Sequence, residues 1–263
     1  MSWSVDSTVL MAMGVCIAAA LSTVLGSLSV LVTKQPSPRL LAFGLAFAGG
    51  AMVYISLVEI FWKAEAGFAG GVTARTAYVY ATLAFFSGVL MLAMIDRLIP
   101  NPHALMSSAA TDSHHIRRVG VLAALAITAH NLPEGLATFL ATLDNPAVGI
   151  SLAAAIAVHN IPEGVSIAIP IYYATGSRRT AIVATCLSAL AEPVGALIGY
   201  LLLAPFLTPA VFAWVFGAIA GAMVFLALDE LLPTAKRYAQ GHETVYGMVI
   251  GMAAIAVSLM LFK

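Results

Sequence analysis

Eight long runs of apolar residues dominate this chain of 263 residues and restrict what it can fold into. Each run is long enough to cross a lipid bilayer as a helix, which takes about 20 residues. The runs cover residues 7–33, 38–62, 75–99, 117–143, 147–171, 179–204, 208–232 and 243–262. Charged residues make up 9% of the chain, against about 25% in a soluble domain. The sequence therefore predicts an all-α integral membrane protein with eight transmembrane helices, in a single domain over residues 1–263.

The connections between the runs predict how the chain is oriented, because Lys and Arg favour the cytoplasmic side of a membrane. If the N-terminus lies outside, nine Lys and Arg residues fall on the inner side and three on the outer side. Both termini are thus predicted outside. The connection that holds His103, His114 and His115 is predicted in the cytoplasm, where it either captures metal or is merely solvated. No basic segment precedes the first run, so we expect it to remain as a helix and not to be cleaved as a signal peptide.

Charge, cysteine pattern and motifs argue against several classes of partner. The net charge is zero, which gives no reason to expect a nucleic-acid partner. The chain has no P-loop, so no nucleotide partner is predicted. Cys16 and Cys186 lie in apolar runs without a pairing pattern and are predicted to be ordinary buried thiols.

A polar motif occurs twice inside the apolar runs, as AHNLPEG at 129–135 and VHNIPEG at 158–164. Five ionisable residues lie far from any predicted helix end and at about the same predicted depth, namely His130, Glu134, His159, Glu163 and Glu192. No Lys or Arg lies at that depth. Carboxylates in a medium of low dielectric must be protonated or must hold a cation. Ionisable residues inside a membrane are therefore candidates for function.

The spacing within the motif favours a metal ion. His and Glu are four residues apart and Asn and Glu three apart, so each pair shares a helix face. Two facing helices would place His130, Glu134, His159 and Glu163 around one centre, and Asn131, Glu134, Asn160 and Glu163 around a second. Imidazole with carboxylate and amide oxygens suits zinc, iron(II), manganese, cobalt or cadmium. The alternative is that these side chains merely form hydrogen bonds between helices.

The motif also contains a proline, which has no backbone N–H to donate. Pro133 and Pro162 should therefore leave the carbonyls of Ala129 and Val158 without a helical donor and kink each helix. A freed carbonyl at membrane depth is tolerated where it lines a polar cavity.

A second repeat relates GAMVYISLVEI at 50–60 to GAMVFLALDEL at 221–231, with an offset of 171 residues. The copies fall in the second and seventh predicted helices, which run in opposite directions. Helices 1–3 and 6–8 thus resemble an inverted repeat around helices 4 and 5, an arrangement typical of secondary transporters. The repeat pairs Glu59 with Glu230, which follows Asp229. These carboxylates are either relay ligands at the two ends of the pathway or groups that simply face water.

HNLPEG, HNIPEG and SALAEP, at the positions of the fourth, fifth and sixth helices, closely resemble the ZIP (Zrt-, Irt-like) family of metal transporters, and its bacterial ZupT branch in particular. The resemblance implies a 3+2+3 arrangement of helices, a homodimer in the bacterial inner membrane, and alternating access that moves a divalent metal into the cytoplasm. It assigns one ion to His130, Glu134, His159 and Glu163, and a second to Asn131, Glu134, Asn160, Glu163 and Glu192. Met52 is a further candidate for the first site, or a packing residue.

Two functions of other classes remain open from the residues alone. A binuclear metal centre inside the membrane also suits a metalloenzyme, although the chain has no HExxH motif and the midplane acids and bases are all used as ligands. A metal sensor would bind the ion without moving it. The inverted repeat favours the transporter.

Overall fold

The computed structural model describes residues 7–32, 37–98, 128 and 131–262, and these residues form helices joined by short connections. In chain order the helices are α1 (Ser7–Ser27), α2 (Ser29–Val32), α3 (Pro38–Ile55), η1 (Ser56–Ile60), α4 (Phe61–Phe68), α5 (Ala74–Leu98), an unlabelled helix at 131–144, α8 (Pro146–Thr175), α9 (Arg178–Ala189), α10 (Ala191–Leu203), η2 (Ala204–Phe206), α11 (Pro209–Leu226), η3 (Ala227–Leu231), α12 (Leu232–Tyr238) and α13 (Glu243–Phe262). Within the described residues the prediction of an all-helical fold is confirmed.

Seven continuous helical stretches of the described residues are long and apolar enough to cross a membrane, and each matches one predicted run. The run at 117–143 lies mostly outside the described residues, although 131–144 is helical. The structure therefore supports an integral membrane protein, while the count of eight and the 3+2+3 arrangement stay predictions.

Two helical stretches extend furthest beyond their apolar runs. Pro38–Phe68 continues past residue 62, and Pro209–Tyr238 continues past residue 232. A helix does not end where hydropathy falls; it ends where the backbone must turn. Pro38–Phe68 is followed by Gly71, whose φ of 90° is accessible mainly to glycine.

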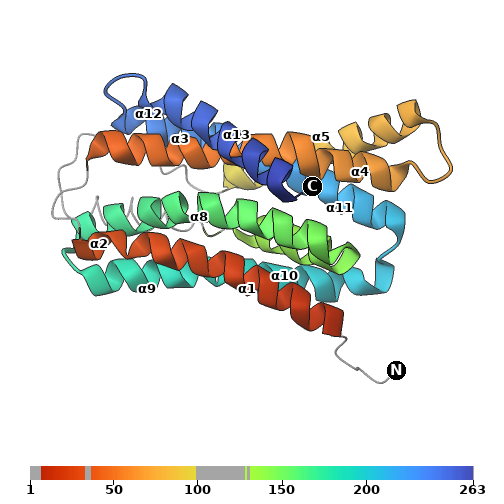
Figure 1. Cartoon of the computed structure of the whole chain (residues 1–263), viewed down its shortest axis with the longest axis horizontal. Coiled ribbons are helices and arrows are strands. Elements are labelled where there is room, and N and C mark those ends of the chain that lie inside the picture. The colour runs from red at the N-terminus through yellow and green to blue at the C-terminus, as the bar shows by residue number, and fades with distance from the viewer. Residues whose placement is uncertain (1–6, 33–36, 99–127, 129–130, 263) are drawn as a thin grey trace.

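The helices pack in two layers, as Figure 1 shows. One layer contains α3, α4, α5, α11, α12 and α13, with α3 against α13 and α11 against α5. The other contains α1, α2, α8, α9 and α10, with α1 against α8 and α9. Contacts between α3 and α8 join the layers. Large apolar side chains such as Leu202 and Leu261, 67% and 77% exposed, cover the outside, as expected for a surface in contact with lipid.

The two copies of the 171-residue repeat have the same backbone irregularity at the same place. Each copy ends in a π-helical turn, η1 in the first and η3 in the second, at positions that the repeat aligns. The N–H of Phe61 donates to the carbonyl of Ser56, and the N–H of Leu232 donates to that of Ala227. Such turns are rare and frequently occur at functional sites. Each one carries a carboxylate of the repeat, Glu59 or Glu230.

The repeat also determines how neighbouring helices approach. A Cβ added at Gly50 of α3 would collide with the carbonyl of Met248 in α13. A Cβ added at the aligned Gly221 of α11 would collide with the carbonyl of Phe85 in α5. Glycine at these positions lets each helix pair pack backbone against backbone.

The cysteine prediction is confirmed for Cys16, which is buried, whereas Cys186 is half-buried; both thiols are free.

Candidate metal centre

A cluster of three buried ligand residues joins the two copies of the polar motif. Glu134 lies on the helix at 131–144, and His159 and Glu163 lie one turn apart on α8. One ligand atom from each lies within 4.8 Å of the others. The Nε2 atom of His159 is 3.2 Å from Oε1 of Glu134. The structure thus brings together three of the four residues predicted for the first centre, while His130 lies outside the described residues.

The cluster contains polar atoms that have no hydrogen-bond partner within the described part of the chain. They are Oε2 of Glu134, Nδ1 of His159 and Oε1 of Glu163, all inaccessible to solvent. Leaving a buried polar group unsatisfied costs about 1–3 kcal/mol, and more for a charged group. A cation bound among these atoms would supply the missing interaction, so this donor set suits a divalent metal with imidazole and carboxylate ligands.

The two asparagines of the motif are held with their carbonyl oxygens available. The Nδ2 atom of Asn131 donates to the carbonyl of Ser188 over 3.0 Å. The Nδ2 atom of Asn160 donates to the carbonyl of Ala19 over 3.2 Å. A backbone carbonyl only accepts hydrogen bonds, so each amide must present its nitrogen to it. The Oδ1 atoms of Asn131 and Asn160 are buried and have no hydrogen-bond partner among the described residues.

Glu192 joins this second group of oxygens from the sixth predicted span. Its Oε1 accepts from Nδ2 of Asn160 over 2.7 Å, and its Oε2 is buried without a hydrogen-bond partner in the described residues. Asn160 and Glu192, which the resemblance assigns to the second ion, are thus in direct contact, while the assignment itself stays a prediction. The atoms gathered here are carbonyl and carboxylate oxygens, which are harder donors than the imidazole of the first cluster.

A break in the sixth span, which sequence reasoning missed, places Glu192. The predicted single helix over 179–204 is divided at Leu190 into α9 and α10, and Glu192 lies in the first turn of α10. Pro193 is the cause, because it cannot donate to the carbonyl of Ala189. The signal was present in the sequence as SALAEP. In contrast, α8 continues through Pro162, so the predicted kink there remains a prediction.

The glycines of the motif allow close approach to neighbouring helices. A Cβ added at Gly135 would collide with the carbonyl of Glu192, and one added at Gly164 would collide with that of Thr23. The motif therefore brings the backbone of each central helix directly against a neighbour, and this contact carries the ligand side chains into one region.

The other candidates have different environments. Met52 is 2% exposed and packs in the apolar core, which agrees with the packing alternative. Glu59 is 6% exposed, Glu230 is half-buried and Asp229 is exposed. The loop histidines His103, His114 and His115 lie outside the described residues.

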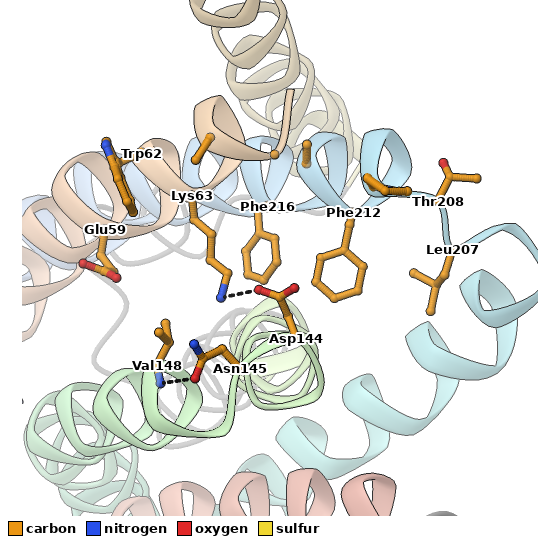
Figure 2. A pocket seen from close by; sticks show the side chains of 14 residues that line it. Glu59, Trp62, Lys63, Asp144, Asn145, Val148, Leu207, Thr208, Phe212 and Phe216 are labelled. Atoms are coloured by element: carbon orange, nitrogen blue, oxygen red, sulfur yellow. Dashed lines mark hydrogen bonds and ion pairs between the residues drawn. The ribbon is translucent and has the colours of Figure 1, made fainter. Parts of the chain in front are cut away.

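A cavity of about 630 Å³ lies between the layers, with Glu59 on its wall. Figure 2 shows Lys63 of α4 reaching from one layer to Asp144 at the end of the helix at 131–144. Their Nζ and Oδ2 atoms are 3.1 Å apart, and Nζ lies 5.2 Å from the ring centroid of Phe216. Sequence reasoning missed this ion pair. Each residue lies near the end of a predicted helix, where a charged side chain is common, and nothing in the sequence links the two.

Comparison with known proteins adds independent information. The sequence model of the family described as "ZIP Zinc transporter" matches residues 101–259. "Zinc transporter ZupT" of Xanthomonas axonopodis pv. citri (strain 306) is 61% identical over 257 residues, covering 96% of this chain and 94% of the relative. The protein of the same name from Neisseria meningitidis serogroup B is 60% identical over 261 residues, covering 97% of each chain. That from Nitratidesulfovibrio vulgaris is 48% identical over 273 residues, covering 98% of this chain and 99% of the relative.

Proposed function

This chain belongs to the ZIP family of zinc transporters, and from that premise we propose that it carries zinc into the cytoplasm through the buried cluster of Glu134, His159 and Glu163. The family consists of transporters, so the metalloenzyme that the residues alone left open is ruled out. The observation that carries the proposal is the cluster itself, where three ligand residues converge with buried atoms that lack partners in the described residues. A bound cation satisfies them; a purely structural contact would not leave them open.

The proposed first position binds the ion through Glu134, His159 and Glu163, with His130 as the fourth ligand. The proposed second position uses the Oδ1 atoms of Asn131 and Asn160, with Glu192 and the same two glutamates. The glutamates then bridge two ions. Iron(II), manganese, cobalt and cadmium accept the same classes of ligand, and we include them as substrates.

Binding of the ion is coupled to loss of protons. A metal binds neutral imidazole and ionised carboxylate, so protons compete with it for both. An ion that enters a set of buried carboxylates also neutralises charge that would otherwise be costly to bury. Transport then needs no nucleotide and runs on the metal gradient.

Alternating access is supported by the division into two layers. The cluster residues lie in the layer of α1, α8, α9 and α10, together with the helix at 131–144. The cavity between the layers provides the outer approach, past Glu59, and the pair of Lys63 and Asp144 bridges the layers there. Displacement of one layer along the other would break this pair and expose the cluster to the opposite side, where Glu230 provides the exit.

The proposal also includes the assembly and its location. The protein works as a homodimer in the bacterial inner membrane with both termini outside.

The decisive experiment is uptake of radioactive zinc into proteoliposomes without nucleotide. Wild type should accumulate zinc, and Glu163→Gln should accumulate little while being incorporated equally. Glu65→Gln is the matched control, because Glu65 lies on α4 outside both the cluster and the cavity. Binding of zinc by wild type without accumulation would contradict transport and favour a metal sensor. Normal uptake by Glu163→Gln would contradict the proposed site.

A further inference from the structure

The surroundings of the two motif copies are related by a local repeat of contacts. Three contacts of the first motif copy have counterparts in the second copy. In each counterpart the motif residue lies 29 positions later in the sequence and its partner 169 positions earlier. They are Asn131 with Ser188 and Asn160 with Ala19; Leu132 with Gly195 and Ile161 with Gly26; Gly135 with Glu192 and Gly164 with Thr23. The first contact in each comparison joins the helix at 131–144 to α9 or α10, and the second joins α8 to α1.

This repeat makes Thr23 the counterpart of Glu192. Both residues present their backbone carbonyl to a motif glycine. Glu192 contributes a carboxylate to the oxygen group. The same position in α1 carries a hydroxyl.

Thr23 has the environment of a functional hydroxyl rather than a packing residue. Its side chain is fully buried, and the polar group beside its Oγ1 is the carboxyl of Glu192. Its neighbours in α1 behave differently: the hydroxyls of Ser22 and Ser27 donate to backbone carbonyls of their own helix, over 2.5 Å and 2.6 Å. The Thr23 hydroxyl instead faces the carboxyl of Glu192, which Asn160 also contacts.

We propose that Thr23 is a specificity-determining residue of the metal pathway, whose hydroxyl oxygen binds the ion held by Asn131, Asn160 and Glu192. This inference rests on the proposed function and adds a ligand to it from α1. A hydroxyl carries no charge, so the two halves of the centre provide a carboxylate and a neutral oxygen at matched positions. The neutral oxygen raises the coordination number without adding charge.

An additional oxygen ligand favours ions that prefer oxygen and higher coordination numbers. Manganese is such an ion, whereas zinc prefers four ligands and nitrogen or sulfur. Removing the hydroxyl should therefore reduce manganese uptake more than zinc uptake. A change that only loosened packing would lower both together.

The test measures uptake of manganese and zinc, supplied together, by proteoliposomes that contain wild type, Thr23→Val or Thr23→Ser. We expect the ratio of manganese to zinc to fall severalfold in Thr23→Val, which keeps the shape but removes the hydroxyl, and to stay near wild type in Thr23→Ser. Thr185→Val is the control, because Thr185 is fully buried but its hydroxyl donates to the carbonyl of Ala181 in its own helix.

An unchanged ratio in Thr23→Val, with active wild type, would overturn the inference and leave the proposed function intact. Wild type that accumulates neither metal would contradict the proposed function instead. If Thr23→Val is not incorporated into the liposomes, Thr23→Ala provides the same comparison with a smaller side chain, and an unchanged ratio there would also overturn the inference.

Discussion

The Nε2 atom of His159 lies 3.2 Å from Oε1 of Glu134, and this contact joins the two copies of the HNxPEG motif across two helices. Glu163, one turn after His159 on α8, is the third member of this cluster. The motif is therefore a half-site, and pairing of the helix at 131–144 with α8 completes it. The predictions below follow from this pairing.

Replacing His159 with Ala should reduce zinc uptake by about tenfold or more, since altering even the partners that support metal ligands costs 10–100-fold. His242→Ala should have little effect, because His242 lies beside Tyr246 at the start of α13, away from the cluster. The measurement is initial uptake over a range of zinc concentrations. Equal loss in both variants would point to a general effect on folding.

Uptake should fall as the external pH is lowered from about 7.5 to about 5.5, the range in which imidazole gains a proton. Protons compete with zinc for the same ligand atoms, and a protonated ligand releases the metal. The affinity for zinc therefore increases with pH. Measured as the zinc concentration for half-maximal uptake, the effect should be smaller in His159→Ala, which has one imidazole fewer. An affinity that rises as pH falls would contradict this view of the site.

Breaking the pair of Lys63 and Asp144 should alter transport without removing the metal site. We expect Lys63→Asp and Asp144→Lys each to lower uptake severalfold, because each places like charges across the layers. The double variant restores the opposite charges and should recover much of the activity. Zinc binding in detergent should stay close to wild type in all three. A double variant no better than either single one would show that the pair does not connect the layers functionally.

Asn160→Ala should lower the number of bound zinc ions per chain from about two to about one. Asn160 provides a carbonyl oxygen and also holds Glu192, through its hydrogen bond of 2.7 Å. The first position, with its histidine and glutamates, should remain. Equilibrium dialysis with elemental analysis gives the ratio. Two ions bound by the variant would contradict the assignment of Asn160 to the second position.

Gly135→Ala and Gly164→Ala should destabilise the protein, because the added methyl group meets a backbone carbonyl of the neighbouring helix. Overpacking of this kind typically costs about 1–3 kcal/mol. Gly14→Ala is the matched control: nothing lies within 4 Å of a Cβ added there, and alanine favours a helix over glycine by about 1 kcal/mol. Thermal unfolding in detergent should show the first two variants below wild type and the third at or above it.

The pattern of apolar runs predicted seven helical stretches of the described chain within a few residues at most ends. The misjudged ends, at Phe68 and Tyr238, lie where the helix continues into polar sequence. Hydropathy indicates which residues lie within the membrane. The end of a helix depends instead on how the last backbone carbonyls are satisfied, by capping groups or by a glycine that lets the chain turn. The break before Glu192 was missed for a related reason, since one proline in an apolar run does not change its hydropathy.

The sequence by itself determined the membrane setting, the twin motifs and the candidate ligand residues, because helical periodicity sets which side chains share a face within one helix. Only the tertiary structure decided which faces meet. Contacts between helices depend on packing over long sequence separations, and the sequence does not state them. The partners of Asn131 and Asn160 and the position of Thr23 beside Glu192 arise from the way the helices approach, where glycines let two backbones meet. The pair of Lys63 with Asp144 likewise depends on which helices face each other.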